Sequence, residues 1–307
     1  MLYCRGMEEM LFRKPKTLFM VIDEFFDARR AERYSPWTID DYQNTFTKFQ
    51  QYAGADTEFE RIDAAVVRGF LSCQDGISDK TLCNYHTALS SLWTWAVDNQ
   101  LTKEHIIRKI RRPSYVTPRI VPFSEDEINK ILKACRCPRD RAIVMVLLDT
   151  GMRATELTGL HLDDWGDRSL LIRCGKGKKS RIVPLSEATE KAIHRQLLKR
   201  SVGLGGVAGG CALFASNISG KPFSYTALSS LMDRLEKYSG VSGVHCHRFR
   251  HTFAITFLRN GGDIYTLKRI LGHSTLMMVQ RYLDIAQSDV ARAHAKASPV
   301  TNWQIRA

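Results

Sequence analysis

Long apolar runs are missing from this 307-residue sequence. The longest, Ile143 to Leu148, is far shorter than the roughly 20 residues that a transmembrane helix needs, and we predict a buried helix there. The N-terminal stretch "MLYCRGMEEMLFRKPK" lacks the apolar middle of a secretory signal peptide, and no lipidation motif accompanies it. We therefore expect a cytoplasmic protein that does not bind membranes.

Paired cysteine motifs are also missing. The eight cysteines are scattered and none forms a CxxC; the closest two, Cys135 and Cys137, have no second pair nearby, which makes them a weak metal candidate. In a large cytoplasmic chain such cysteines are predicted to be reduced thiols packed in the core.

Acidic residues are outnumbered. The chain has 32 Asp and Glu against 45 Lys and Arg, a net charge of +13. This excess indicates a polyanionic partner, either nucleic acid or an anionic membrane, although a merely basic soluble enzyme would fit as well. No basic amphipathic surface helix supports the membrane alternative. The hydrophobic content of 44% and the length predict a globular chain of two domains.

Residues 14–100 predict a compact helical domain. Apolar residues recur at helical spacing in "TLFMVIDEFFDARR" and in "SDKTLCNYHTALSSLWTWAVDNQ". Between these segments, Ser35 is expected to cap a helix that begins at Pro36 and ends before Gly54. No alternating strand pattern interrupts the region.

Residues 101–122 predict a basic linker. The stretch "IIRKIRRPSYVTPRIVP" contains three prolines and several basic residues but no acidic one. Prolines disfavour a continuous helix. A solvated loop is one interpretation; the density of positive charge favours a strap lying along a phosphate backbone.

Residues 123–307 predict a second, mainly helical domain with a small β-hairpin, an α+β fold. Ser124 and Glu127 form a capping-box pattern. The stretch "SLLIRCGKGKKSRIVPL" reads as two short strands joined by a glycine-rich tip. Further along, Asp263 is expected to cap a helix that ends at Gly272. The tail around Val290 suggests one more helix.

Several charged residues of this domain are candidates for a site. Arg153 follows a buried helix, where an ion pair with Glu156 three residues on or a bidentate grip on phosphate oxygens would explain it. Lys176 lies between two glycines that would let a ligand approach the backbone closely, although an ordinary turn lysine is the alternative. Arg181 and its lysine neighbours are expected to contact a nucleic-acid backbone or solvent.

The heptad "HCHRFRH", residues 245 to 251, combines three histidines, two arginines and a cysteine. Zinc would have to sit beside Arg248 and Arg250 with no carboxylate to balance them, so an anion fits better. His-x-x-Arg occurs in two registers, as His245 with Arg248 and as His247 with Arg250.

The stretches "TGMRATELTGL", "GKGKKSRIVPL", "HRFRHTFA" and "LGHSTLMMVQRY" together resemble the tyrosine recombinases, which include the phage integrases and the Xer-type site-specific recombinases. The motifs follow the family's order over nearly the whole chain. The resemblance implies a two-domain clamp, with a helical core-binding domain before the catalytic one. Minor departures are Cys246, where the family often has proline, and Phe249, where leucine is common.

The resemblance also implies a set of site residues. The family's second arginine directly precedes "HTFA", which selects the register of His247 and Arg250. For the lysine of the hairpin motif, Lys178 and Lys179 are alternatives to Lys176. The implied catalytic residues are Arg153, Lys176, His247, Arg250, His273 and Tyr282.

The chemistry implied by the family is attack of Tyr282 on a DNA phosphate, giving a 3′-phosphotyrosine bond that needs no ATP, metal or cofactor. The arginines would clamp the phosphate oxygens, His273 would donate a hydrogen bond to them, and His247 would handle the phenol proton. Lys176 would protonate the leaving 5′-oxygen. Glu156 is expected to orient Arg153, and His251 to be a packing residue.

The implied partner is double-stranded DNA, bound by a homotetramer on two duplexes with the C-terminal tail docked on a neighbouring protomer. Relaxation of supercoils by a type IB topoisomerase-like activity, or a non-enzymatic accessory role, are the competing functions. Among recombinases we favour integration and excision of a mobile element over Xer-like resolution of chromosome dimers. About fifteen residues precede the first helix, too few for the extra arm-binding domain of many integrases.

Overall fold

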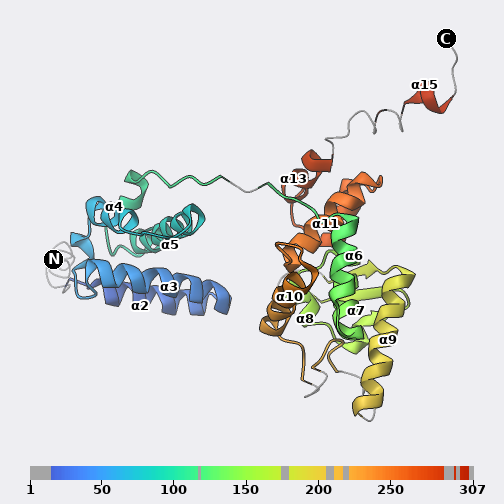
Figure 1. The fold of residues 1–307 in the computed structure, drawn as a ribbon. Helices are drawn as coiled ribbons and strands as arrows, with labels where there is room; N and C mark the ends of the chain where they lie inside the picture. The colour runs from blue at the N-terminus through green and yellow to red at the C-terminus, as the bar shows by residue number, and fades with distance from the viewer. Residues whose placement is uncertain are drawn as a thin grey trace, which may run out of the picture. The chain divides into compact units, whose positions relative to one another are not determined.

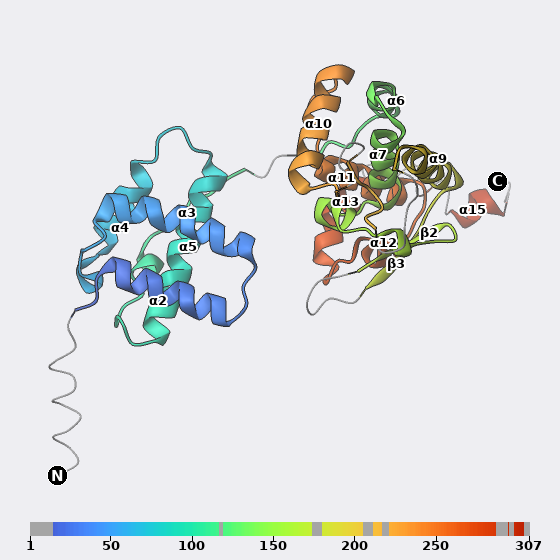
Figure 2. The ribbon, with the colours of Figure 1, turned by 90° about the horizontal axis from the view of Figure 1, so that it is seen from below.

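The computed structural model describes residues 15–116, 119–173, 180–204, 211–216, 221–286, 294 and 298–303. The chain forms two compact units, Met1–Pro118 and Arg119–Ala307, and each is described by itself (Figures 1 and 2). Within these ranges no helix combines the length and apolar character needed to cross a membrane.

The first unit is helical, as predicted. Ser35 caps α3 through its side chain, Pro36 is the first helical residue, and Gly54 with φ of 86° ends the helix. The elements are α2 (Leu18–Ala31), α3 (Pro36–Ala53), α4 (Ala64–Ser72) and α5 (Asp79–Asp98), with 3-10 turns at Phe59–Arg61 and Ile106–Lys109.

Aromatic side chains fill the core of this unit. Phe59 stacks on Trp93 with ring centroids 4.8 Å apart, and Phe25 meets Phe46 edge-on at 5.5 Å. Such rings bury large apolar surfaces and lock their neighbours in defined orientations. The core therefore comes from the helical apolar pattern that the sequence displays.

The segment expected as a linker is divided in the structure. Ile106, Ile107 and Ile110 are buried in the core of the first unit, and the ring nitrogen Nε2 of His86 lies 3.1 Å from the Ile110 carbonyl oxygen. The first unit therefore extends past residue 100, because these isoleucines add apolar surface to it. Residues 111–116 follow without regular secondary structure.

The second unit is mainly helical with a small sheet, which confirms the predicted fold class. Its helices up to the sheet are α6 (Glu125–Ala134), α7 (Pro138–Thr150) and α8 (Ala154–Thr158). The strands β1 (Trp165–Gly166), β2 (Ser169–Ile172) and β3 (Arg181–Pro184) pair antiparallel in the order β1-β2-β3. The later helices are α9 (Glu187–Leu204), α10 (Tyr225–Ser239), α11 (Cys246–Arg259), α12 (Ile264–Leu271), α13 (Met277–Ala286) and α15 (Pro299–Asn302).

The structure confirms the helix caps and the hairpin strands that the sequence predicted in this unit. The capping box of Ser124 and Glu127 begins α6, and Asp263 and Gly272 delimit α12. The hairpin strands β2 and β3 form where expected, and β3 lies beside α12 (Figure 2). The hairpin tip with Lys176 and the helix suggested around Val290 lie outside the described residues.

Cysteine placement differs from expectation. Cys83 is buried, whereas Cys73 is exposed and the other described free cysteines are half-buried. Core packing therefore explains only part of the cysteine content.

The turn between α7 and α8 sets up the site. Gly151 adopts φ of 59° and ends α7. A side chain there would also collide, because a Cβ would lie 2.5 Å from the Phe253 ring and 2.9 Å from Leu271. This tight turn places the Gly151 carbonyl beside Arg250 of α11 and Arg153 beside Leu271, the last residue of α12.

Candidate active site

Arg153 is the N-cap residue of α8. The Glu156 carboxylate accepts from the Arg153 backbone N–H at 2.8 Å and from the guanidinium Nη1 at 3.1 Å. The expected ion pair between the two residues is thus confirmed. A third of the Arg153 side chain, 33%, remains exposed, so it can still reach a ligand.

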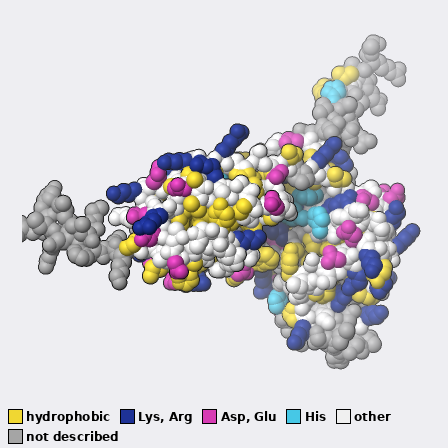
Figure 3. Space-filling view, turned by 60° about the vertical axis from the view of Figure 1, so that its left-hand side comes forward, with side chains coloured by type: hydrophobic (Ala, Val, Ile, Leu, Met, Phe, Trp, Pro, Cys, Tyr) yellow, Lys and Arg dark blue, Asp and Glu magenta, His cyan; other side chains and the backbone are white. Residues whose placement is uncertain are grey.

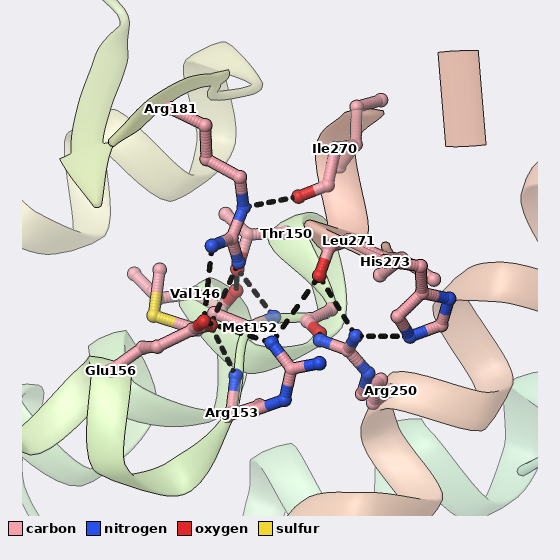
Figure 4. A network of polar contacts seen from close by, with 11 residues as sticks. Val146, Thr150, Met152, Arg153, Glu156, Arg181, Arg250, Ile270, Leu271 and His273 are labelled. Carbon is pink, nitrogen blue, oxygen red and sulfur yellow. Dashed lines mark hydrogen bonds and ion pairs between the residues drawn. The ribbon is translucent and has the colours of Figure 1, made fainter. Parts of the chain in front are cut away.

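Arg250, on α11, is buried with an exposed fraction of 2%. Its guanidinium donates to the carbonyls of Gly151 at 2.8 Å and Leu271 at 2.9 Å, and lies 2.6 Å from Nε2 of His273 (Figure 4). Burial and the neighbouring Arg153 charge lower its pKa to about 10, which leaves it cationic at neutral pH. Since these hydrogen-bond partners are all neutral, the site favours a bound anion.

Arg181 belongs to the same network, although the sequence indicated a residue in contact with nucleic acid or solvent. From β3 it donates to both Glu156 oxygens at 3.0 and 2.7 Å and to the Ile270 carbonyl at 2.6 Å (Figure 4). Its side chain is only 10% exposed. Gly272 makes room for it, because a Cβ there would lie 2.9 Å from Nη1. Glu156 therefore orients two arginines.

The half-buried His273 follows α12. Arginine can only donate, so Nε2 of His273 accepts from Arg250 and the proton lies on Nδ1. Burial, followed by the charges of Arg250, Arg153 and Arg181, lowers the His273 pKa to about 4. The ring is therefore neutral at pH 7. Its buried Nδ1 has no hydrogen-bond partner in the described part of the chain, which leaves a donor for a ligand.

Tyr282, on α13, is buried with 5% of its surface exposed. Its ring lies parallel to the His273 ring at 6.5 Å between centroids. The phenol oxygen lies 2.9 Å from Nδ1 of His251. Burial raises the phenol pKa, and the charge and hydrogen bond of Arg250 oppose that rise. His251 was expected to be a packing residue; it contacts the phenol instead.

His247 lies one turn before His251 on α11, with the two rings edge-on at 4.9 Å. It lines a cavity of about 200 Å³ together with Arg153, Met152, Tyr225 and His245. Partial burial and the charge of Arg250 lower its pKa. Figure 3 shows histidine side chains gathered on one face of the second unit. Lys176, the remaining implied site residue, lies outside the described residues.

The other register of the heptad has structural partners. Arg248 donates to Glu127 at 3.0 and 3.1 Å, to the carbonyls of Val121 and Ser242, and stacks on Phe123 at 3.9 Å. His245 caps α11 through Nδ1. No group of three or more His, Cys, Asp or Glu side chains in the described ranges is arranged to hold a metal ion.

Comparisons with known proteins identify the family of the chain. Residues 122–289 match the model described as Phage integrase family, and residues 22–100 match that of the Phage integrase, N-terminal SAM-like domain. Tyrosine recombinase XerC of Thermodesulfovibrio yellowstonii is 28% identical over 303 residues, covering 93% of this chain and 98% of the relative.

Solved structures agree as well. The XerA recombinase is 27% identical with a TM-score of 0.52, covering 91% of this chain and 98% of that one. A lambda integrase tetramer bound to a Holliday junction shares the fold, with a TM-score of 0.71, 19% identity, and coverage of 88% and 78%.

The similarity extends over both units, and this chain is a tyrosine recombinase. More specifically, it belongs to the phage integrase family, because the model of that family's catalytic domain covers more than half of the chain.

Proposed function

We propose that this protein cleaves and rejoins duplex DNA at specific sites through a 3′-phosphotyrosine bond on Tyr282. The observation that carries the proposal is the convergence of a buried phenol on α13 with Arg250 on α11 and His273 in the turn after α12. A phosphodiester placed among them would meet a nucleophile, a cation and a hydrogen-bond donor at once.

The arginines have an electrostatic role in this proposal. The reacting phosphorus centre accumulates negative charge on its non-bridging oxygens, and donors fixed in advance stabilise that charge. Arg250 brings a buried cation with neutral partners, and Arg153 is oriented by Glu156. His273 would add the Nδ1 hydrogen bond that is unused in the described structure.

Two proton transfers accompany cleavage. We assign protonation of the leaving 5′-oxygen to Lys176, on the family pattern of the hairpin motif. The same pattern assigns the phenol proton to His247. The histidine nitrogen within hydrogen-bond distance of the phenol oxygen, however, belongs to the neighbouring His251.

The test is the variant Tyr282→Phe on a nicked suicide substrate, in which the 5′-hydroxyl fragment diffuses away and the covalent product accumulates. The wild type should trap DNA in a denaturant-resistant complex and the variant none, because phenylalanine lacks the attacking oxygen. Equal trapping by both proteins would refute the phosphotyrosine chemistry.

The assembly we propose is a homotetramer on two duplexes in the cytoplasm, with the C-terminal tail docked on a neighbouring protomer. The lambda integrase tetramer on a Holliday junction, which shares the fold, supports this assembly. Cross-linking of a chain truncated at about residue 288 checks the tail: assembly should weaken, and unchanged assembly would argue against docking in trans.

The biological role we propose is integration and excision of a mobile element. His245, Cys246 and the tail depart from the pattern of housekeeping enzymes. The XerC relative supports Xer-like resolution of chromosome dimers as the second candidate. Mapping the DNA site that the protein protects separates the two, and joining of two marked sites in one reaction separates both from a topoisomerase.

A further inference from the structure

We propose that His251 is a catalytic residue that removes the phenol proton of Tyr282 as the phenol oxygen attacks the DNA phosphate. This inference rests on the proposed phosphotyrosine chemistry and names the proton acceptor within it. The family pattern instead gives that task to His247, one helical turn away.

The geometry of α11 and α13 carries the inference. The two helices pack against each other, and Nδ1 of His251 lies 2.9 Å from the phenol oxygen of Tyr282. A general base must lie within about 2.6–3.2 Å of the atom that loses the proton. The ring of His247 packs edge-on against His251, so His251 lies between His247 and Tyr282.

The direction of the hydrogen bond follows from the tautomer of His251. In the neutral ring that carries its proton on Nε2, Nδ1 can only accept, and the phenol oxygen donates its hydrogen to Nδ1. The positive charge of Arg250 favours the ionised phenol. This arrangement places the phenol proton on the path to the base.

The charge state of His251 suits a base. Partial burial, and then the charges of His247, His245, Arg281 and Arg250, lower its pKa to about 4. The ring is neutral at pH 7, and its Nδ1 lone pair is free to take a proton. A phosphate bound at the arginines would add negative charge nearby and strengthen this base when substrate is present.

The cleavage step balances as follows. The bond between the phenol oxygen of Tyr282 and phosphorus forms while the bond between phosphorus and the 5′-oxygen breaks. The phenol proton moves to Nδ1 of His251, and the leaving 5′-oxygen takes a proton from Lys176. In rejoining, a 5′-hydroxyl attacks phosphorus and gives its proton to the neutral Lys176. The bond between phosphorus and the phenol oxygen breaks, and protonated His251 returns its proton to that oxygen.

The experiment isolates the phenol proton by using a DNA substrate with a 5′-bridging sulfur at the cleavage site, since a thiolate leaves without a proton. Single-turnover cleavage is measured from pH 7 to 9. The wild type should be nearly independent of pH, because the neutral base is present throughout. His251→Ala should cleave about 10²–10⁴-fold more slowly at pH 7 and gain about tenfold per pH unit, because only the ionised phenolate then reacts.

His251→Asn sharpens the test, because its amide oxygen can still accept the phenol hydrogen bond but has no useful basicity. It should reproduce the tenfold rise per pH unit, whereas a merely structural role would be restored by it. His247→Ala should keep the flat profile. The matched control is His194→Asn, an exposed histidine of α9, which should cleave like the wild type.

Thermal unfolding and DNA affinity of each variant confirm that the protein is folded and binds substrate. A flat profile for both His251 variants, or a rate within threefold of the wild type, would overturn the inference. Covalent trapping by Tyr282→Phe is a different result, because it would refute the proposed function itself.

Discussion

Arg248 and Arg250 lie two residues apart on α11, in regions that treat a guanidinium very differently. On the face toward α6, Arg248 meets the Glu127 carboxylate, two backbone carbonyls and an aromatic ring. On the face toward α7 and the end of α12, Arg250 meets two carbonyls and a neutral imidazole. The charge of Arg248 is balanced by Glu127, whereas Arg250 has no carboxylate among these hydrogen-bond partners.

This difference explains why one arginine stabilises the fold and the other can bind an anion. Glu127 is a carboxylate whose pKa is lowered, since hydrogen bonds from Ser124 and Arg248 outweigh its desolvation. Arg250 is more deeply buried, and a phosphate would supply the negative charge that its hydrogen-bond partners lack. The chemistry of each arginine is thus set by the face of the helix from which it projects.

The largest effect on cleavage should come from a substitution of Arg250, on the face of α11 toward α7 and the end of α12. Arg250→Lys keeps the positive charge but loses the planar fork that holds two carbonyls and a phosphate oxygen together. Single-turnover cleavage should fall by about 10²–10³-fold, equivalent to about 2.7–4 kcal/mol of transition-state stabilisation. A cleavage rate close to that of the wild type would show that Arg250 takes no part in the reaction.

An intermediate effect, on the free energy of unfolding, should come from Glu156→Gln, because the Glu156 carboxylate binds both Arg153 and Arg181. Burial alone would raise the Glu156 pKa, but the hydrogen bonds and charges of Arg181 and Arg153 lower it overall. A lowered pKa means that the carboxylate stabilises the fold above its ordinary pKa, and that this contribution disappears as pH falls through the lowered value.

The free energy of unfolding should therefore differ between wild type and Glu156→Gln by about 1.5–3 kcal/mol at pH 7. The difference should shrink steadily as the solution is acidified below the ordinary carboxyl pKa. Denaturant titrations over this pH series make the measurement. A difference that stays constant with pH would show that the carboxylate charge is not what holds the arginines.

The smallest effect on catalysis should come from a substitution of Arg248, on the face of α11 toward α6. Arg248→Met removes the ion pair and leaves carbonyls unsatisfied, which should reduce the free energy of unfolding by about 1–3 kcal/mol. The folded variant should still cleave at nearly the wild-type rate. If its cleavage fell as far as that of Arg250→Lys, the contrast between the two faces would be lost.

Local sequence signals predicted much of the fold. The caps at Ser35, Ser124 and Asp263 depend on neighbours within a few residues, so the sequence displays them directly. The role of Ile106 and Ile110 was hidden, because basic residues and prolines around them suggested a linker. Arg153, Arg250, His273 and Tyr282 were selected by motif resemblance, and the structure brings them together.

Arg181 and His251 show where sequence reasoning ends. Arg181 reaches a carboxylate 25 positions earlier and a carbonyl 89 positions later, and His251 meets a phenol 31 positions away. Such contacts depend on how helices pack, and no periodicity or cap encodes them. The histidine next to Arg250 was visible in the sequence, but only the packing of α13 reveals its partner.

The most direct test of the central claim is to identify the bond that joins protein to DNA. Covalent complexes trapped on a suicide substrate are digested with protease and nuclease, and the modified peptide is sequenced by mass spectrometry. The account predicts a phosphate ester on Tyr282, attached to a DNA 3′-end with a free 5′-hydroxyl on the released strand. A linkage through any other residue, or to a DNA 5′-end, would contradict it.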